Sequence, residues 1–254
     1  MSNHRDSEFS ELLLSFDSRA LERCVLAADI LAEEFDEPFM EYALLGLADE
    51  RMPFHVIATP LLVGQIVSRS KVEQPGRQVL RMRDEVEALS RRMRRPLVPI
   101  TFIHRHPGGC RASTTDHDFL RTVFVDQVST LVSFQAECRI DAAHPPCACA
   151  GLQRRLRETA SDGNGFVDLR SEWGVAFSLI VNRMRDHRIY AVRKTTCSFC
   201  GRSEVSEVPA RIIPDPQSSI LAMDRVGMRS HLMREIEAKI RFEKTPRMSE
   251  QRTW

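Results

Sequence analysis

Residues 104–116 read HRHPGGCRASTTD and follow the apolar run LVPITFIH at 97–104. The apolar run predicts a buried β-strand that brings His104 and His106 to its C-terminal end. Side chains at positions i and i+2 of an extended strand point to the same face, so both imidazoles can bind one metal ion. This stretch therefore predicts a core strand of the fold and a metal site at the end of that strand.

Two further polar groups stand at the start of the next apolar segment. Asp116 offers a carboxylate as a third ligand, which leaves the fourth position for water, as in catalytic zinc sites. Ser113 can donate a hydrogen bond to a developing oxyanion. The S-x-x-D spacing is also typical of a helix capping box, which stabilises a helix by about 1 kcal/mol. We expect a helix over 114–128, and the capping and ligand roles are compatible.

Helix and strand patterns flank this stretch on both sides. Apolar residues at helical spacing predict one or two amphipathic helices within 8–35 and single helices at 77–95, 152–158 and about 220–242. Short apolar or alternating runs predict strands at 39–48, 54–63, 174–182, 187–194 and 203–213. We expect 174–182 and 187–194 to form a hairpin, and Pro60 favours an edge or a bulge for its strand.

The bulk composition is that of an ordinary globular protein, since 43% of the 254 residues are hydrophobic and 28% are charged. The net charge of +1 argues against broad electrostatic binding of nucleic acid or of an anionic membrane. No stretch approaches the length of a transmembrane helix, so we expect a cytoplasmic protein. Only four of the 36 basic residues are Lys, and this excess of Arg suggests a GC-rich bacterial genome.

The cysteines form two close pairs that are far apart in the sequence. A C-x-C pair lies in a stretch of unusual composition at 132–172, and a C-x-x-C-G turn follows the late strands. Four thiolates from two turns predict a closed structural zinc site. The expected ligands are Cys147, Cys149, Cys197 and Cys200, with Cys138 and His144 as alternatives. Buried free cysteines and a redox C-x-x-C remain alternative interpretations. We expect Cys110 to be incidental and Cys24 to be a core residue.

The segment HPPCAC at 144–149 also suggests a nucleobase deaminase. That chemistry requires H-x-E followed by P-C-x-x-C, and neither pattern is present in the required form. A zinc-dependent deaminase is therefore a poor fit to the sequence.

The order of an upstream Glu, H-x-H-P and S-x-x-D resembles the JAMM metalloprotease family, also called JAB or MPN-plus. Glu41 and the apolar run after it resemble the E-x-x-G-L-L element of that family, although Leu44 stands where a Gly is frequent. The family usually has one more residue between its second His and the Ser than the six found here. Asp118 is therefore an alternative ligand to Asp116, and Glu37 is an alternative to Glu41.

The resemblance covers roughly residues 37–131 and 173–213. It implies an α/β (α+β) fold, with an MPN-type curved mixed β-sheet flanked by helices. The expected organisation is an N-terminal helical segment at 1–36, a metalloprotease-like domain at 37–213 with an insertion at about 132–172, and a C-terminal helix and tail at 214–254. The N-terminal helices could pack on the core, form a dimer or bind a partner.

The resemblance also implies a mechanism. His104, His106 and Asp116 would bind the catalytic zinc, Glu41 would act as general base, and Ser113 would stabilise the oxyanion. Family members mostly cleave peptide or isopeptide bonds after the C-terminal glycine of ubiquitin or a ubiquitin-like modifier. In a bacterium, the expected partners are a ubiquitin-like protein and the activating and conjugating enzymes of an antiviral system. The alternative is a non-catalytic scaffold of the same fold.

Overall fold

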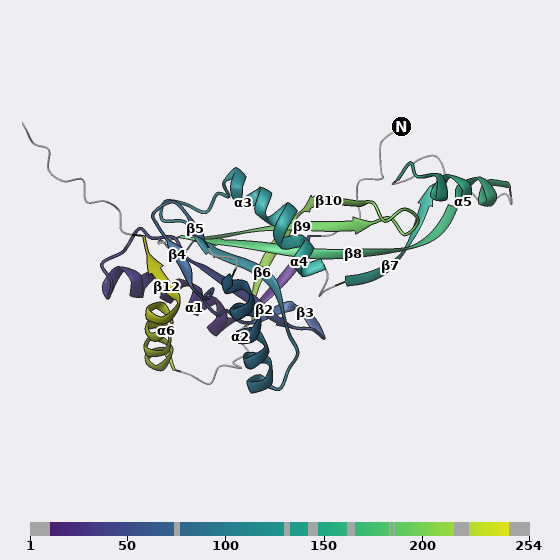
Figure 1. Cartoon of the computed structure of the whole chain (residues 1–254). Helices are drawn as coiled ribbons and strands as arrows, with labels where there is room; N and C mark the ends of the chain where they lie inside the picture. The colour runs from purple at the N-terminus through teal and green to yellow at the C-terminus, as the bar shows by residue number, and fades with distance from the viewer. Residues whose placement is uncertain are drawn as a thin grey trace, which may run out of the picture. The chain divides into compact units, whose positions relative to one another are not determined.

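The computed structural model describes residues 11–73, 77–129, 133–141, 147–161, 166–182, 184, 186–215 and 224–243 (Figure 1). The chain divides into two compact units, which are described separately below. The larger unit comprises Leu13–Ala112, Ser178–Ile189 and Arg211–Trp254. The smaller unit comprises Met1–Leu12, Ser113–Phe177 and Tyr190–Ala210.

The centre of the larger unit is strand β2 (Ala43–Asp49), in which every residue is buried. It pairs antiparallel with β3 (Met52–Ala58) on one side and with β6 (Leu97–Arg105) on the other. Strand β1 (Leu12–Asp17) then adds to β3 in a parallel arrangement. A strand that is buried on both faces reads as a continuous apolar run, which is why ALLGLA and LVPITFI predict strands correctly.

The strand β1 corrects the expectation that helices account for residues 8–35. Leu14 and Phe16 are fully buried, whereas Leu13 between Leu12 and Leu14 is 45% exposed. This alternation has the period of a strand. The helix α1 (Ser18–Glu33) begins only after Asp17, whose side chain accepts a hydrogen bond from the Arg19 N–H at 2.8 Å. One strand and one helix therefore replace the predicted helices.

The position of Pro60 is also corrected. Strand β3 ends at Ala58 and is paired on both sides, so the edge alternative is wrong and Pro60 lies outside the strand. A register shift typical of a β-bulge does occur where β3 pairs with β2, between Leu47 and Ala48 and again between Ala48 and Asp49. Pro60 lies just after the strand, and its carbonyl accepts a hydrogen bond from the Leu45 N–H at 2.9 Å. The missing N–H of a proline costs nothing at this position, because no strand pairing is required of it.

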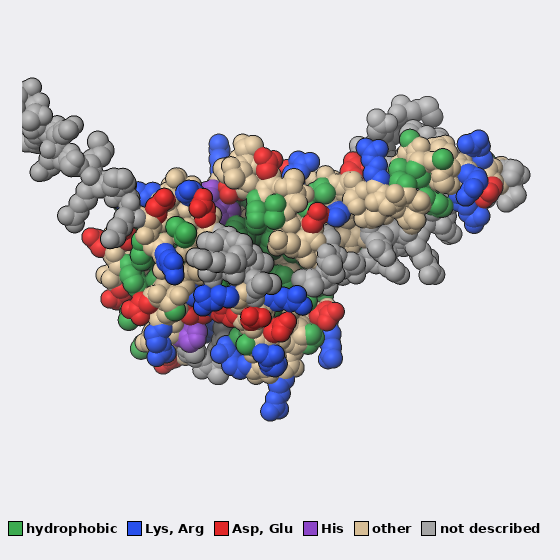
Figure 2. Space-filling model, in the orientation of Figure 1, with side chains coloured by type: hydrophobic (Ala, Val, Ile, Leu, Met, Phe, Trp, Pro, Cys, Tyr) green, Lys and Arg blue, Asp and Glu red, His purple; other side chains and the backbone are tan. Residues whose placement is uncertain are grey.

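Helix α2 (Arg77–Met93) confirms the helix predicted from its periodicity, and it packs against β6. Basic and acidic side chains alternate on the described part of this helix (Figure 2). Glu87 lies 3.5 Å from the Arg83 guanidinium and 4.0 Å from that of Arg91, each one helical turn away. These exposed i,i+4 pairs mark a solvated helix face.

The C-terminal helix α6 (Arg225–Lys239) packs against α1 and is shorter than predicted. Residues Ile240–Phe242 instead form β12, which pairs in parallel with β4 (Gln65–Val67). Strand β5 (Val72–Glu73) completes this three-stranded sheet. The local pattern did not predict this strand, because its backbone partner, β4, lies far away in the sequence.

The smaller unit opens with a continuous helical segment. It consists of α3 (Thr114–Phe119), a π-helical turn (Leu120–Phe124) and α4 (Val125–Ser129), which confirms the helix predicted over 114–128. Helix α5 (Ala150–Ser161) confirms the helix predicted at 152–158.

The strand β8 (Phe166–Val181) is longer than the sequence predicts. It pairs antiparallel with β7 (Ser133–Asp141), and its first residues lie within the stretch expected to be an insertion. The predicted hairpin is confirmed, because β8 is a sheet neighbour of β9 (His187–Thr196). The turn between them is closed by the Asn182 N–H, which donates to the Asp186 carbonyl at 3.0 Å.

The strand predicted at 203–213 is in fact two strands, β10 (Ser203–Val208) and β11 (Ala210–Asp215). The main sheet has the order β10-β9-β8-β6-β2-β3-β1-β11, with β7 on β8, among the residues that the structure describes. The protein is thus a mixed α/β structure consistent with the expected α+β class. None of the described helices is long and apolar enough to span a membrane.

A buried ionic network joins three helices of the larger unit. The Arg23 guanidinium on α1 binds the Glu235 carboxylate on α6 and donates to the Thr59 carbonyl at 3.1 Å. Lys239 on α6 binds Glu235 and also Glu85 on α2. Burial lowers the pKa of Arg23 to about 10. Glu235 is therefore the anion that both cations share.

We predict that Glu235→Gln lowers the free energy of unfolding by about 3 kcal/mol, because it leaves the buried Arg23 charge without its carboxylate. Urea denaturation monitored by circular dichroism measures the change. The matched control is Glu73→Gln, which removes one partner of the exposed pair with Lys71 and should leave the unfolding transition unchanged. Equal effects of the two substitutions would contradict this account of the network.

Candidate metal centres

The two histidines of the H-x-H motif face each other at the end of β6. His104 is buried and His106, one residue beyond the strand, is half-buried. Their Nε2 atoms are 3.0 Å apart. Two nitrogens bound to one tetrahedral zinc at 2.0–2.1 Å would be about 3.3 Å apart, so the pair is nearly arranged for a common ion.

Arg105, between the two histidines, points away from them and is fully buried. Its guanidinium donates to the carbonyl oxygens of Pro38 at 2.6 Å and Met40 at 3.0 Å. No role was predicted for Arg105 from the sequence, although an Arg inside an apolar strand is unusual and indicates a buried, paired side chain. Arg105 fixes the backbone that leads into Glu41.

Glu41 lies just before β2, the strand that pairs with the histidine strand. Ala43 lies opposite His104, and the Arg105 N–H donates to the Tyr42 carbonyl at 2.9 Å. Glu41 stands two residues before Ala43, where its N–H donates to the Ser68 carbonyl at 2.9 Å. The start of β2 therefore brings the backbone of Glu41 near the end of β6.

The alternative base, Glu37, lies in the turn after α1, where its N–H donates to the Leu31 carbonyl at 2.8 Å. It precedes the part of the chain that continues the β2–β6 register. Glu41 is therefore nearer in the sequence than Glu37 to Ala43, the residue paired with His104.

In the smaller unit, Ser113 and Asp116 form a complete capping box at the start of α3. The Ser113 N–H and Oγ–H both donate to Asp116 Oδ2 at 2.7 Å, and the Asp116 N–H donates to Ser113 Oγ at 3.2 Å. This confirms the capping interpretation of S-x-x-D. A carboxylate has two oxygens, so an Asp that caps with one can still bind a metal with the other.

The predicted ligands are divided between the two units, with His104 and His106 in the larger unit and Asp116 in the smaller. The alternative ligand Asp118 is exposed. Two imidazole nitrogens and one carboxylate oxygen suit zinc, and a three-ligand set leaves a position for water.

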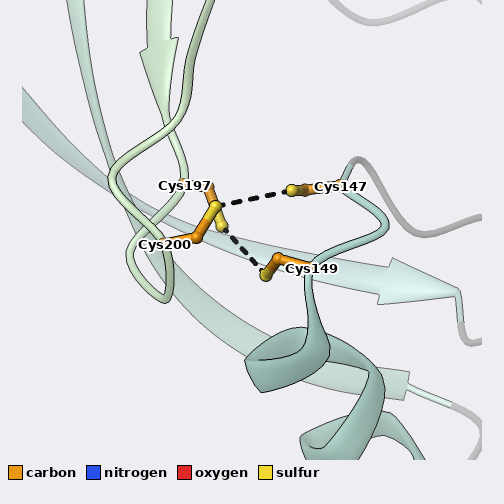
Figure 3. Close-up of side chains that lie close together, drawn as sticks. All are labelled: Cys147, Cys149, Cys197 and Cys200. Atoms are coloured by element: carbon orange, nitrogen blue, oxygen red, sulfur yellow. Dashed lines mark hydrogen bonds between the residues drawn. The ribbon is translucent and has the colours of Figure 1, made fainter.

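The second group consists of four cysteines in the smaller unit, namely Cys147, Cys149, Cys197 and Cys200. Their sulfur atoms all lie within 4.8 Å of one another. Figure 3 shows the C-x-C segment that precedes α5 directed at the turn between β9 and β10. The structure thus brings together all four cysteines that the sequence predicted as ligands.

Hydrogen bonds make one of these thiols acidic. Burial acts to raise the pKa of Cys197, but hydrogen bonds from the backbone at Phe199 and Cys200 outweigh it and lower the pKa to about 7. The backbone at Arg202 acts to lower the pKa of Cys200, but burial and the neighbouring thiols raise it to about 11.

The remaining cysteines behave as expected or lie outside this description. Cys24 is buried on α1, and burial raises its pKa to about 12, which confirms it as a core residue. Cys110 donates to the Asp186 carbonyl at 3.2 Å. The alternative ligand His144 lies outside the described residues, as does the side chain of Cys138.

No protein-family model matches this chain, and no curated protein matches it. The functional assignment therefore depends on the chemistry of these two groups and on the motif resemblance.

We predict that Arg105→Met lowers the free energy of unfolding by about 3 kcal/mol, because the Pro38 and Met40 carbonyls lose a buried charged donor. Arg95→Met is the control, since Arg95 is 44% exposed and should change stability by no more than about 0.5 kcal/mol. Chemical denaturation measures both variants. An Arg105 variant as stable as wild type would show that the strand end does not depend on this side chain.

Proposed function

We propose that this chain is a zinc-dependent protease that cleaves after the C-terminal glycine of a ubiquitin-like modifier. The observation that carries the proposal is the histidine pair at the end of β6, with Nε2 atoms 3.0 Å apart. Glu41 stands two residues before Ala43, the residue paired with His104. Two imidazoles at a strand end with a carboxylate nearby in the chain are the parts of a hydrolytic metal centre.

In this proposal, His104, His106 and Asp116 hold the ion. Zinc bound there would supply Lewis acidity and a water acidic enough to react at neutral pH. The half-buried Glu41 accepts the proton of the attacking water and returns it to the leaving amine.

Ser113 is assigned to the oxyanion. Its hydroxyl donates to Asp116 Oδ2 at 2.7 Å, so the same O–H serves the capping box. A hydroxyl has one proton to donate, and Ser113 must release this bond before it can donate to a substrate oxygen. Occupation of Asp116 by a metal ion would weaken its hold on that proton.

The substrate class comes from the resemblance to the JAMM family. The glycines at the end of such a tail carry no side chains. The tail can therefore pair with a sheet edge and enter a narrow groove. The excess of Arg over Lys favours a bacterial client, such as a ubiquitin-like protein of an antiviral conjugation system. Its activating and conjugating enzymes are the expected partners.

The second candidate function is a non-catalytic scaffold of the same fold. The complete capping box favours it, because Ser113 and Asp116 satisfy each other without a metal ion. The loop from His106 to Ser113, one residue shorter than is usual in the JAMM family, points the same way.

We predict that Glu41→Gln retains zinc but loses a factor of about 10²–10⁴ in cleavage rate, because the amide cannot accept a proton. The assay uses a ubiquitin-like protein fused through its C-terminal glycine to a fluorescent reporter. Glu37→Gln is the matched control and should cleave at the wild-type rate. Wild-type activity in Glu41→Gln would refute Glu41 as the base.

The metal ligands are tested separately by elemental mass spectrometry. His104→Ala/His106→Ala should lose one zinc ion per chain relative to wild type, together with all cleavage. Zinc content unchanged by this double substitution would refute the catalytic centre. Unchanged zinc content in the double variant, combined with no cleavage of any glycine-terminated fusion by wild type, would instead support the scaffold, which needs no metal ion at this site.

A further inference from the structure

We propose that Cys147, Cys149, Cys197 and Cys200 form a closed structural zinc site that fastens α5 to the turn between β9 and β10. All four residues belong to the smaller unit. The proposal does not depend on the hydrolytic activity, and it uses none of the residues assigned to that activity.

The separations of the sulfur atoms fit a tetrahedral zinc ion. Cys147 Sγ lies 3.7 Å from Cys200 Sγ, and Cys149 Sγ lies 3.8 Å from Cys197 Sγ. Zinc–sulfur bonds of 2.3 Å at tetrahedral angles place two sulfurs about 3.8 Å apart. A disulfide would bring them to about 2.05 Å. Each of the two pairs joins one cysteine of the C-x-C segment to one of the C-x-x-C turn (Figure 3).

Backbone hydrogen bonds close the C-x-x-C turn. The Gly201 N–H donates to the Cys197 carbonyl, and the Cys197 N–H donates to the Arg202 carbonyl, each at 2.9 Å. Gly201 has a φ of 71°, a conformation that glycine adopts without strain. The turn therefore holds its two thiols in place, so less conformational entropy is lost on binding.

The opposite side of the site is positioned by close packing. A Cβ on Gly151, in the first turn of α5, would lie 3.1 Å from Phe199 Cβ. Phe199 lies between Cys197 and Cys200, so the start of α5 approaches the turn as closely as a glycine permits. The two segments meet through this contact as well as through the thiols.

Among the described residues, the apolar cluster at α5 contains the buried Leu152 and Leu156, against which Cys147 and Cys149 pack. The thiols therefore lie beside the buried face of this helix, and a metal held by them would cross-link that face to the turn. Zinc would supply that cross-link, and four thiolates would leave no position open for water or substrate.

The proposal is tested in the His104→Ala/His106→Ala variant, in which any zinc that remains must be bound elsewhere. We expect one zinc per chain in this variant by elemental mass spectrometry. Adding Cys197→Ser/Cys200→Ser should reduce it to zero, and adding Cys110→Ser instead should leave one. Cys110 is a matched control because it is a half-buried thiol outside the cluster.

Two results would overturn the proposal: absence of zinc from the histidine variant, or retention of its zinc after the cysteine substitutions. Isolation of the wild-type chain with Cys147–Cys200 and Cys149–Cys197 disulfides and no zinc at the cysteines would also overturn it.

A second measurement covers the case in which the cysteine variants fail to fold. The full-length wild-type chain is loaded with Co²⁺, and its absorption spectrum is recorded. Sulfur-to-cobalt charge transfer with the intense visible bands of a tetrahedral ion is expected, whereas the His, His and Asp ligands supply no sulfur. Absence of the charge-transfer bands would refute thiolate ligation. The catalytic proposal would be unaffected, because its own test measures cleavage.

Discussion

The antiparallel pairing of β2 with β6 is the constraint on which the candidate catalytic centre depends. The register sets Ala43 opposite His104. A shift by one residue would move every side chain of β6 to the other face of the sheet and would put Arg105 on the face that now carries the imidazoles. Because every residue of β2 is buried, such a shift is strongly disfavoured. The packing of the sheet therefore fixes the face to which the two histidine side chains point.

The buried Arg105 adds a second constraint on the same strand. A guanidinium this deep must find acceptors, and it finds them in the Pro38 and Met40 carbonyls. The strand that carries the histidines therefore also holds the segment that leads to Glu41. Arg105 is thus a positioning residue, and one strand end holds both the proposed histidine ligands and the segment that leads to the proposed base.

The sequence predicts the parts of the fold whose signal is local. Helix 77–95, the strand that ends at the histidines and the capping box are confirmed because their patterns are complete within a few residues. Strands β1 and β12 were missed, because their partners β3 and β4 lie elsewhere in the chain and local helical spacing fitted them equally well. The role of Arg105 was missed for the same reason, since the Met40 carbonyl lies 65 residues earlier. Spacing alone identified the four cysteines, but only the fold shows that they meet.

The central claim, that one zinc ion binds at the end of β6, is tested most directly by anomalous X-ray diffraction at the zinc absorption edge. We expect an anomalous peak within about 2.1 Å of the Nε2 atoms of His104 and His106 and of a carboxylate oxygen of Asp116. A crystal of the zinc-loaded chain whose anomalous signal is confined to the cysteine cluster would contradict it.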